Sequence, residues 1–360
     1  MVAEKTTNKN RRISLIVLCA LLAVLFSVSV PAATTAKIGK KSFSSVQKAF
    51  ASAKNGQTIT LMKNATVTGS AKPILSGKKK VVINLNKHTL RIKGTTDVNK
   101  SLIFSNCKNI TIKNGTIAGN LNFIGSSTNN LISNVKITGS GKTPTDNKLD
   151  PTLGGGGLNY TANGKLTLKK ATIENITVNG AMGGKPKLII ESGNYSFVCI
   201  ENGGEATING GKFTFLSESS TRDPFGYNTI FDIRGGSKLT VNNGTFKSKA
   251  KVVSLGGGQC IIKKGTFTST GEYKSPVVEV SFGTLKISGG TFSASNHERY
   301  NDSNDLYFGG EAVISIGGNS SGYVKNCTLI NKNATDKSRL FYTYGNNNKV
   351  TMSNTKLIIA

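Results

Sequence analysis

The chain has 360 residues, of which 46 are Lys or Arg and 18 are Asp or Glu, so its formal net charge is +28. This charge excludes cationic polymers as natural partners and favours polyanions such as acidic polysaccharide, teichoic acid, anionic lipid surfaces or nucleic acid. There is no Trp, so any stacking against sugar rings is left to Tyr and Phe. The lysines are spread along the chain and not massed in one run, so a merely solubilising lysine surface is the alternative interpretation.

The first 36 residues have the order of a secretory signal peptide. Four Lys and Arg residues between positions 5 and 12 precede an apolar run over 13–30, and small residues follow it. This order predicts a cleaved signal at 1–36 and a secreted, extracellular protein with no membrane segment after cleavage. The alternative is an uncleaved membrane anchor, because the run approaches the length that spans a bilayer.

Four cysteines lie beyond the predicted signal, at Cys107, Cys199, Cys260 and Cys327. They allow three full disulfide pairings, among which the sequence does not choose. Cys260 and Cys327 fall at apolar or Gly positions of a repeated phrase. That placement favours buried, unpaired thiols over disulfides or a metal site.

A short amphipathic helix is predicted over about 43–54. Apolar residues recur there at helical spacing, and Asn55-Gly56 follows as a stop signal. A helix placed before a series of strands can cover their first open edge. Residues 37–60 are therefore predicted to form an N-terminal cap.

The rest of the chain repeats one eight-residue phrase. It reads LTVNNGTF at 239–246 and recurs as ATINGGKF at 206–213, CIIKKGTF at 260–267 and LKISGGTF at 285–292. The phrase predicts a short strand A, a Gly turn and a strand B. A third strand, C, follows each time and often ends in Gly-Gly. Three short strands per period of about twenty residues predict the coils of a parallel β-helix. In this fold the inward-facing residues of each coil are buried only by stacking on the neighbouring coils.

The repeat, together with the helical cap and NGQTITL at 55–61, resembles the pectate-lyase-like right-handed β-helix superfamily, of the kind found in secreted bacterial surface proteins. The resemblance covers about 38–360. It implies an all-β, right-handed, single-stranded parallel β-helix of about 10–12 coils over 61–360. The superfamily contains lyases, glycoside hydrolases, adhesins and phage spikes, so the resemblance implies a fold and leaves the function open.

Three intervals between repeats are long, near 138–157, 215–230 and 293–311. The extra residues fall between strand B and strand C each time, which predicts three inserts at one corner of the coil. The inserts are rich in acidic, Arg and aromatic residues. Long loops on a rigid scaffold often carry function. The alternative is that loops are polar in any protein.

The outward positions of strand C beside these inserts are the predicted ligand-binding site. Glu201, Asp232 and Arg234 should lie on adjacent coils, where two carboxylates with an Arg can bind a cation and a uronate or act as acid and base. A structural salt bridge across strands is the competing interpretation. The full predicted set is Glu201, Arg222, Asp223, Tyr227, Asp232, Arg234 and Glu279.

No catalytic pattern of the superfamily is complete. Arg91-Ile-Lys93 matches one polygalacturonase-like motif but stands alone, and no close Asp pair on a strand offers the calcium site of pectate lyases. The sequence therefore leaves any catalytic residues unknown and favours a protein that is not an enzyme, with no metal site and no cofactor.

The expected function is that of a secreted basic β-helix protein binding an acidic polysaccharide, glycan or cell-wall polymer, surface-associated or adhesin-like. No specific nucleic acid is expected as a partner, and the last repeat near 350–357 favours end-to-end self-association. The alternative function is a polysaccharide lyase or glycoside hydrolase acting on a uronic-acid polysaccharide, and a lyase could use Ca²⁺.

Overall fold

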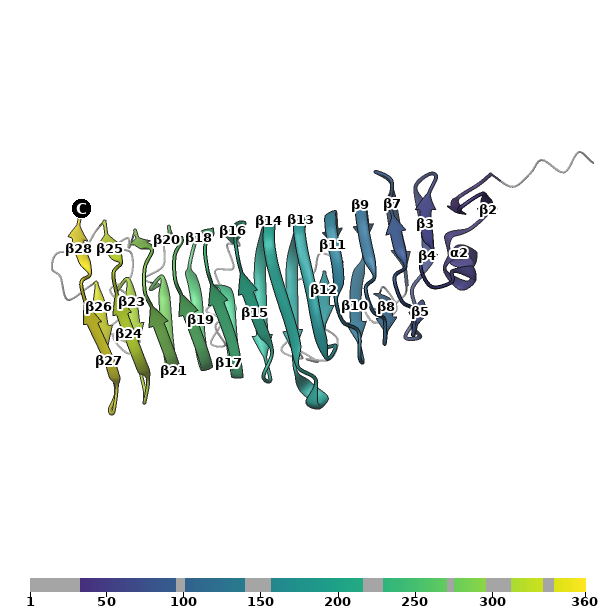
Figure 1. The fold of residues 1–360 in the computed structure, drawn as a ribbon. Coiled ribbons are helices and arrows are strands. Elements are labelled where there is room, and N and C mark those ends of the chain that lie inside the picture. Colours follow the sequence, from purple (N-terminus) through teal and green to yellow (C-terminus); the bar gives the residue numbers. More distant parts are fainter. Residues whose placement is uncertain are drawn as a thin grey trace, which may run out of the picture. The chain divides into compact units, whose positions relative to one another are not determined.

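The structure, a computed structural model, describes residues 33–94, 101–139, 157–215, 229–270, 275–295, 312–332 and 340–360. Contacts divide the chain into Met1–Thr34 and Thr35–Ala360, and the second unit is described by itself below. Its described residues are mostly β, in a sheet of 28 strands (Figure 1). Apart from the two pairings of β1, the strand pairings are parallel, an arrangement consistent with a β-helix.

The N-terminal strands form a hairpin that the sequence did not predict. Strands β1 (Ala36–Ile38) and β2 (Lys41–Phe43) pair antiparallel, and β1 also pairs antiparallel with β3 (Thr58–Leu61). Phe43 is thus the last residue of a strand and not the first of a helix.

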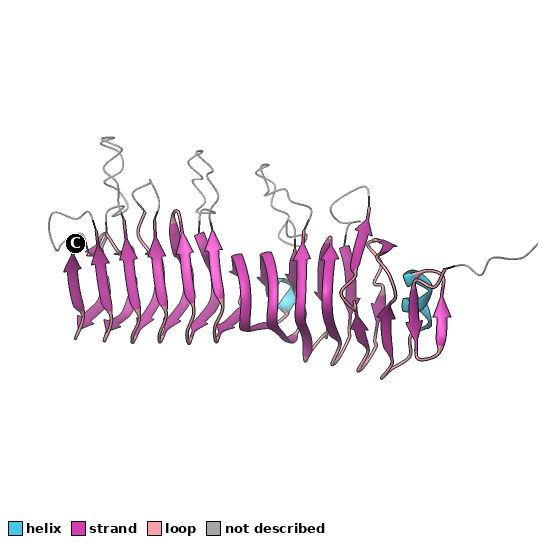
Figure 2. Cartoon of the chain, turned by 90° about the horizontal axis from the view of Figure 1, so that it is seen from above, coloured by secondary structure: helices cyan, strands magenta, loops and turns pink. Residues whose placement is uncertain are grey.

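Helix α2 (Val46–Ser52) is shorter than the predicted helix over 43–54. The Ser45 side chain caps it by accepting a hydrogen bond from the Lys48 backbone N–H at 3.3 Å. Val46, Ala49 and Phe50 are buried, and the helix packs against β1 to β4 (Figure 2). It therefore lies against the first strands of the sheet.

The remaining strands stack in three series of parallel pairings, which we call A, B and C after the strands of the repeat. Long strands belong to more than one series, and a short 3-10 helix, η2 (Ala181–Gly183), interrupts the chain. Series A contains, in stacking order, β3 (Thr58–Leu61), β6 (Val82–Asn84), β9 (Thr111–Ala118), β11 (Asn130–Thr138), β13 (Gly164–Asn179), β14 (Pro186–Glu201), β15 (Glu205–Ile208), β17 (Thr229–Val241), β19 (Lys251–Ile262), β21 (Val278–Ile287), β24 (Ser321–Lys325) and β27 (Lys349–Ser353).

Series B and C share the long strands of series A and add shorter ones. Series B adds β4 (Ala65–Thr68), β7 (Thr89–Lys93), β16 (Lys212–Phe215), β18 (Thr245–Ser248), β20 (Thr266–Ser269), β22 (Thr291–Ala294), β25 (Thr328–Asn331) and β28 (Lys356–Ile359). Series C adds β5 (Leu75–Ser76), β8 (Ser101–Ser105), β10 (Asn120–Ile124), β12 (Leu158–Tyr160), β23 (Ile314–Ile316) and β26 (Phe341–Thr343).

The strand register confirms the alignment of the repeated phrase. Its first residue pairs from Ala206 to Leu239 to Cys260 to Leu285. Its last residue pairs from Phe213 to Phe246 to Phe267 to Phe292. Equivalent positions of the repeat therefore lie directly above one another.

Aligned aromatic rings fill part of the core. Ring centroids are 5.0 Å apart between Tyr195 and Phe213 and between Phe213 and Phe246. They are 4.6 Å apart between Phe246 and Phe267 and between Phe267 and Phe292. All five rings are buried. The spacing matches that of paired strands, so each ring stacks on the next because the register places it there.

The turn between A and B explains the Gly and Asn of the phrase. Gly244 has φ +148°, and a Cβ there would lie 2.6 Å from the Phe246 ring. Asn side chains at this turn bond across the stack, as from Asn242 Nδ2 to Asn209 Oδ1 at 2.7 Å. These contacts favour Asn at the turn positions of the phrase.

The three predicted inserts lie almost wholly outside the described residues, between a series B strand and a series C strand in each case. The four cysteines Cys107, Cys199, Cys260 and Cys327 are unpaired, as predicted, and all but Cys199 are buried. Among the described residues, no helix combines the length and apolar character needed to cross a membrane.

Candidate functional site

The register brings the predicted series C residues into one row. Cys199 pairs with Asp232, Asp232 with Ser254, and Ser254 with Glu279. Ile200 pairs with Ile233, and Glu201 and Arg234 are the next residues along these two strands. In these strands alternate residues such as Phe231 and Ile233 point into the core, so the polar residues between them point outward.

Asp232 and Arg234 form an ion pair on strand β17. Arg234 Nε donates to Asp232 Oδ1 at 2.8 Å, and a second guanidinium nitrogen contacts Asp232 Oδ2. The Asp232 side chain is only 2% exposed, whereas that of Arg234 is 34% exposed. Burial of a carboxylate is costly unless a cation pairs with it, so Arg234 stabilises the charge of Asp232 here.

Glu201 lies on the neighbouring strand beside this ion pair. Its Oε1 accepts a hydrogen bond from Asn179 Nδ2 at 2.9 Å. Burial raises the pKa of the Glu201 carboxyl, Arg234 lowers it in part, and Asp232 raises it further. A carboxyl with a raised pKa beside a second carboxylate is an arrangement found in acid–base sites and also in structural networks.

Glu201, Asp232 and Arg234 form a cluster that also contains Cys199. The Cys199 thiol is not an activated nucleophile. Burial raises its pKa, and the nearby charges of Asp232 and Glu201 raise it further, against a smaller opposing effect of Arg234. The thiolate is the reactive form of cysteine, so this thiol stays protonated and inert at neutral pH.

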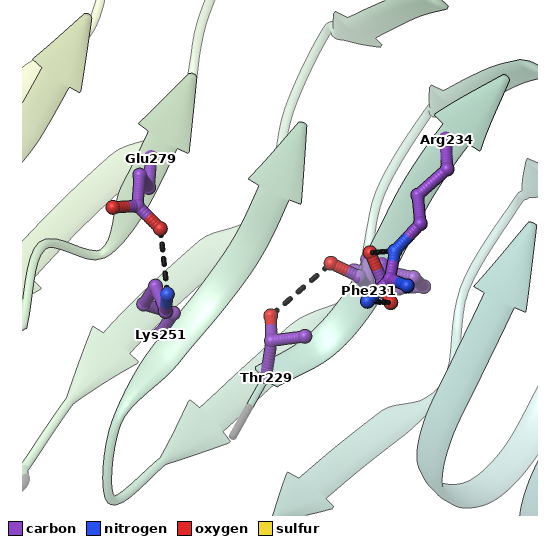
Figure 3. A network of polar contacts seen from close by, with 6 residues as sticks. Thr229, Phe231, Arg234, Lys251 and Glu279 are labelled. Carbon is purple, nitrogen blue, oxygen red and sulfur yellow. Dashed lines mark hydrogen bonds and ion pairs between the residues drawn. The ribbon is translucent and has the colours of Figure 1, made fainter. Parts of the chain in front are cut away.

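Glu279 lies apart from the Asp232 cluster. Two strand spacings separate the two residues along the row, or about 10 Å. Glu279 accepts from Lys251 Nζ at 2.6 Å, and Figure 3 shows these two side chains pointing toward each other. Its charge, after the larger effect of burial, also raises the pKa of Tyr344. The predicted site is therefore two separate ion pairs on one row.

The other three predicted residues, Arg222, Asp223 and Tyr227, lie outside the described residues. In the described part, three carboxylates (Glu201, Asp232 and Glu279) face two cations, Arg234 and Lys251. This part of the row therefore carries no excess positive charge with which to attract an anionic polymer.

Two neighbours of the site were missed from the sequence. Asn179 pairs directly with Glu201 in the parallel register, and its Oδ1 accepts from Asn202 Nδ2 at 3.0 Å. Aligning the segment at 176–179 with that at 198–201 would have found it. Lys251 begins its strand and reaches Glu279 on the next strand, which the repeat alone does not indicate.

No group of three or more His, Cys, Asp or Glu residues in the described part of the chain is placed to hold a metal ion. No protein-family model matches the chain, and no curated protein or solved structure matches it. The resemblance to the pectate-lyase-like superfamily therefore rests on the repeated phrase and its parallel stacking.

Proposed function

We propose that residues 61–360 form a right-handed, single-stranded parallel β-helix of about 10–12 coils with three strands per coil. The parallel register at each copy of the repeated phrase supports this proposal. The sequence pattern of 1–36 supports export of the protein to the cell exterior.

The proposed function is binding of an acidic polysaccharide, glycan or cell-wall polymer outside the cell, in a surface-associated or adhesin-like role without catalysis. The observation that carries the proposal is the charge. Four basic residues and one acid lie in 1–36, which leaves a net charge of +25 on the remaining chain. Fixed charge of one sign attracts polymers of the other sign.

Binding should be measured by titration calorimetry with polygalacturonate, a teichoic acid and a neutral glucan, from about 50 to about 300 mM salt. We expect the anionic polymers to bind, with an association constant that falls linearly in a logarithmic plot against salt, because binding releases counterions. The neutral glucan controls for salt-independent sugar contacts. Absence of anionic polymer binding at the lowest salt would refute the proposal.

A second candidate is a lyase or glycoside hydrolase acting on a uronic-acid polysaccharide. The neighbouring carboxyls of Glu201 and Asp232 favour it, because burial raises the pKa of Glu201 whereas Asp232 is paired with Arg234, and two carboxyls in different environments can serve as acid and base. Incubation with polygalacturonate or alginate, with and without Ca²⁺, should release unsaturated ends that absorb ultraviolet light if the protein is a lyase, and reducing ends if it is a hydrolase. Activity lost in Glu201→Gln would support this candidate, and no product from any uronate substrate would exclude it.

A further inference from the structure

The stacking of the strands gathers lysines that are distant in sequence. Exposed lysines lie on, or a few residues before, five of the six successive series A strands from β3 to β14. We call these residues the basic ridge: Lys54, Lys79, Lys80, Lys108, Lys165 and Lys187.

Backbone contacts fix the order of the ridge. Lys79 bridges to Lys108 in parallel register, and Lys165 pairs with Lys187. Lys54 precedes Asn55, whose Oδ1 accepts from the Lys79 backbone N–H at 2.9 Å. The strands involved follow one another in Figure 1, and five strand spacings make the ridge about 24 Å long.

Almost no acid opposes this charge. The described residues of 33–94 and 101–139 contain sixteen Lys and Arg and no Asp or Glu. The ion pairs between described residues do not involve Lys54, Lys79, Lys108 or Lys165. Glu205 pairs with Lys187 at 3.2 Å and closes the ridge at its far end.

We infer that the basic ridge is the binding site for a linear polymer with regularly repeated negative charges, carboxylate or phosphodiester, lying along the stacking direction. The inference rests on the proposed function and moves its site from the series C row to the ridge. A band of cations that extends over several strands complements a chain of charges better than it complements a compact anion.

The composition of the ridge favours a glycan or polyol phosphate over single-stranded nucleic acid. Proteins that hold single strands combine cations with aromatic side chains on which the bases stack. The residues between the ridge lysines are instead small and polar, including Asn55, Asn109, Thr128 and Gly164. They offer no aromatic platform.

The test compares two triple variants with the same loss of charge. The ridge triple is Lys79→Gln, Lys108→Gln and Lys165→Gln. The distal triple is Lys263→Gln, Lys349→Gln and Lys356→Gln, at exposed positions outside the ridge, on or next to β19, β27 and β28. Both are titrated over a salt series with polygalacturonate, which carries carboxylates, and with polyglycerol phosphate, which carries phosphodiesters.

The ridge triple should weaken binding about tenfold or more and reduce the salt slope by about two to three, because each lost contact removes about 0.7–0.9 from the slope. The distal triple should leave the slope unchanged. The polymer that binds the wild-type protein more tightly identifies the source of the charge. Equal weakening by both triples would overturn the ridge and leave the proposed function intact, whereas a wild-type protein that binds neither polymer would overturn both.

Discussion

Glu201 shows how position in a strand changes the chemistry of a single carboxyl. It is held by Asn179 and lies beside the Asp232–Arg234 ion pair, and burial is the largest cause of its raised pKa. The folded chain therefore binds the Glu201 proton more tightly than the unfolded chain does. This contribution to stability is complete below the ordinary pKa of a Glu and is lost as the pH rises through the folded pKa.

Replacement of Glu201 by Gln should remove this pH-dependent loss, since Gln does not ionise and its Oε1 can still accept from Asn179. We expect the variant to exceed the wild type in free energy of unfolding at about pH 7 and to lose that advantage near pH 4. Urea unfolding at several pH values measures the difference. Glu205→Gln, in the exposed pair with Lys187, is the control for loss of one negative charge. A constant difference between variant and wild type across this range would contradict the prediction.

At the scale of the elements, the repeated phrase predicted which residues of neighbouring strands pair. It did not predict which long side chains contact one another across strands. Period-two patterning and the Gly turn determine the register that aligns Phe213 with Phe246. The helix boundary was wrong because Phe43 belongs to the hairpin of β1 and β2, and β1 also pairs with β3, which follows the helix in the sequence. The Lys251–Glu279 pair was missed because a long side chain at a strand end reaches the next strand. The ridge was missed because sequence spacing alone made its lysines seem scattered.

The stacked rings of series B should make the stability of each strand depend on the strands next to it. Phe246 is fully buried between Phe213 and Phe267, so Phe246→Ala leaves a cavity in the stack. We expect a loss of about 3–5 kcal/mol in the free energy of unfolding, measured by urea titration with circular dichroism. Phe282, which is 55% exposed, provides the matched control, with an expected loss below about 1 kcal/mol for Phe282→Ala. Similar losses in both variants would argue against the stack as a source of stability.

For the molecule as a whole, the two ends of the strand stack differ. Helix α2 packs against the first strands, whereas β26, β27 and β28 each pair on one side only within the described residues. Tyr342 and Ile359 on these strands are 38% and 40% exposed. Open strand edges with exposed apolar side chains favour pairing with another chain, so end-to-end self-association stays a prediction of this protein.

Sedimentation velocity over a range of protein concentrations tests this association. We expect a dimer to form as concentration rises, and the combined variant Tyr342→Lys and Ile359→Lys to remain monomeric, because charged residues on an edge oppose pairing. Met62→Lys, at a position 39% exposed near the opposite end of the stack, should dimerise as the wild type does. A wild-type protein that stays monomeric throughout would contradict the prediction.

The uneven distribution of lysines has a consequence for orientation. Among the described residues, those of 33–139 contain sixteen basic residues and no acid, whereas those of 157–360 are more numerous and contain eighteen basic residues and six acids, giving net charges of +16 and +12. The strand stack therefore carries an electric dipole moment along its axis, with the positive pole toward the first strands. Near a negatively charged surface the field exerts a torque on this dipole, which turns the first strands toward the surface and leaves β26 to β28 directed away from it.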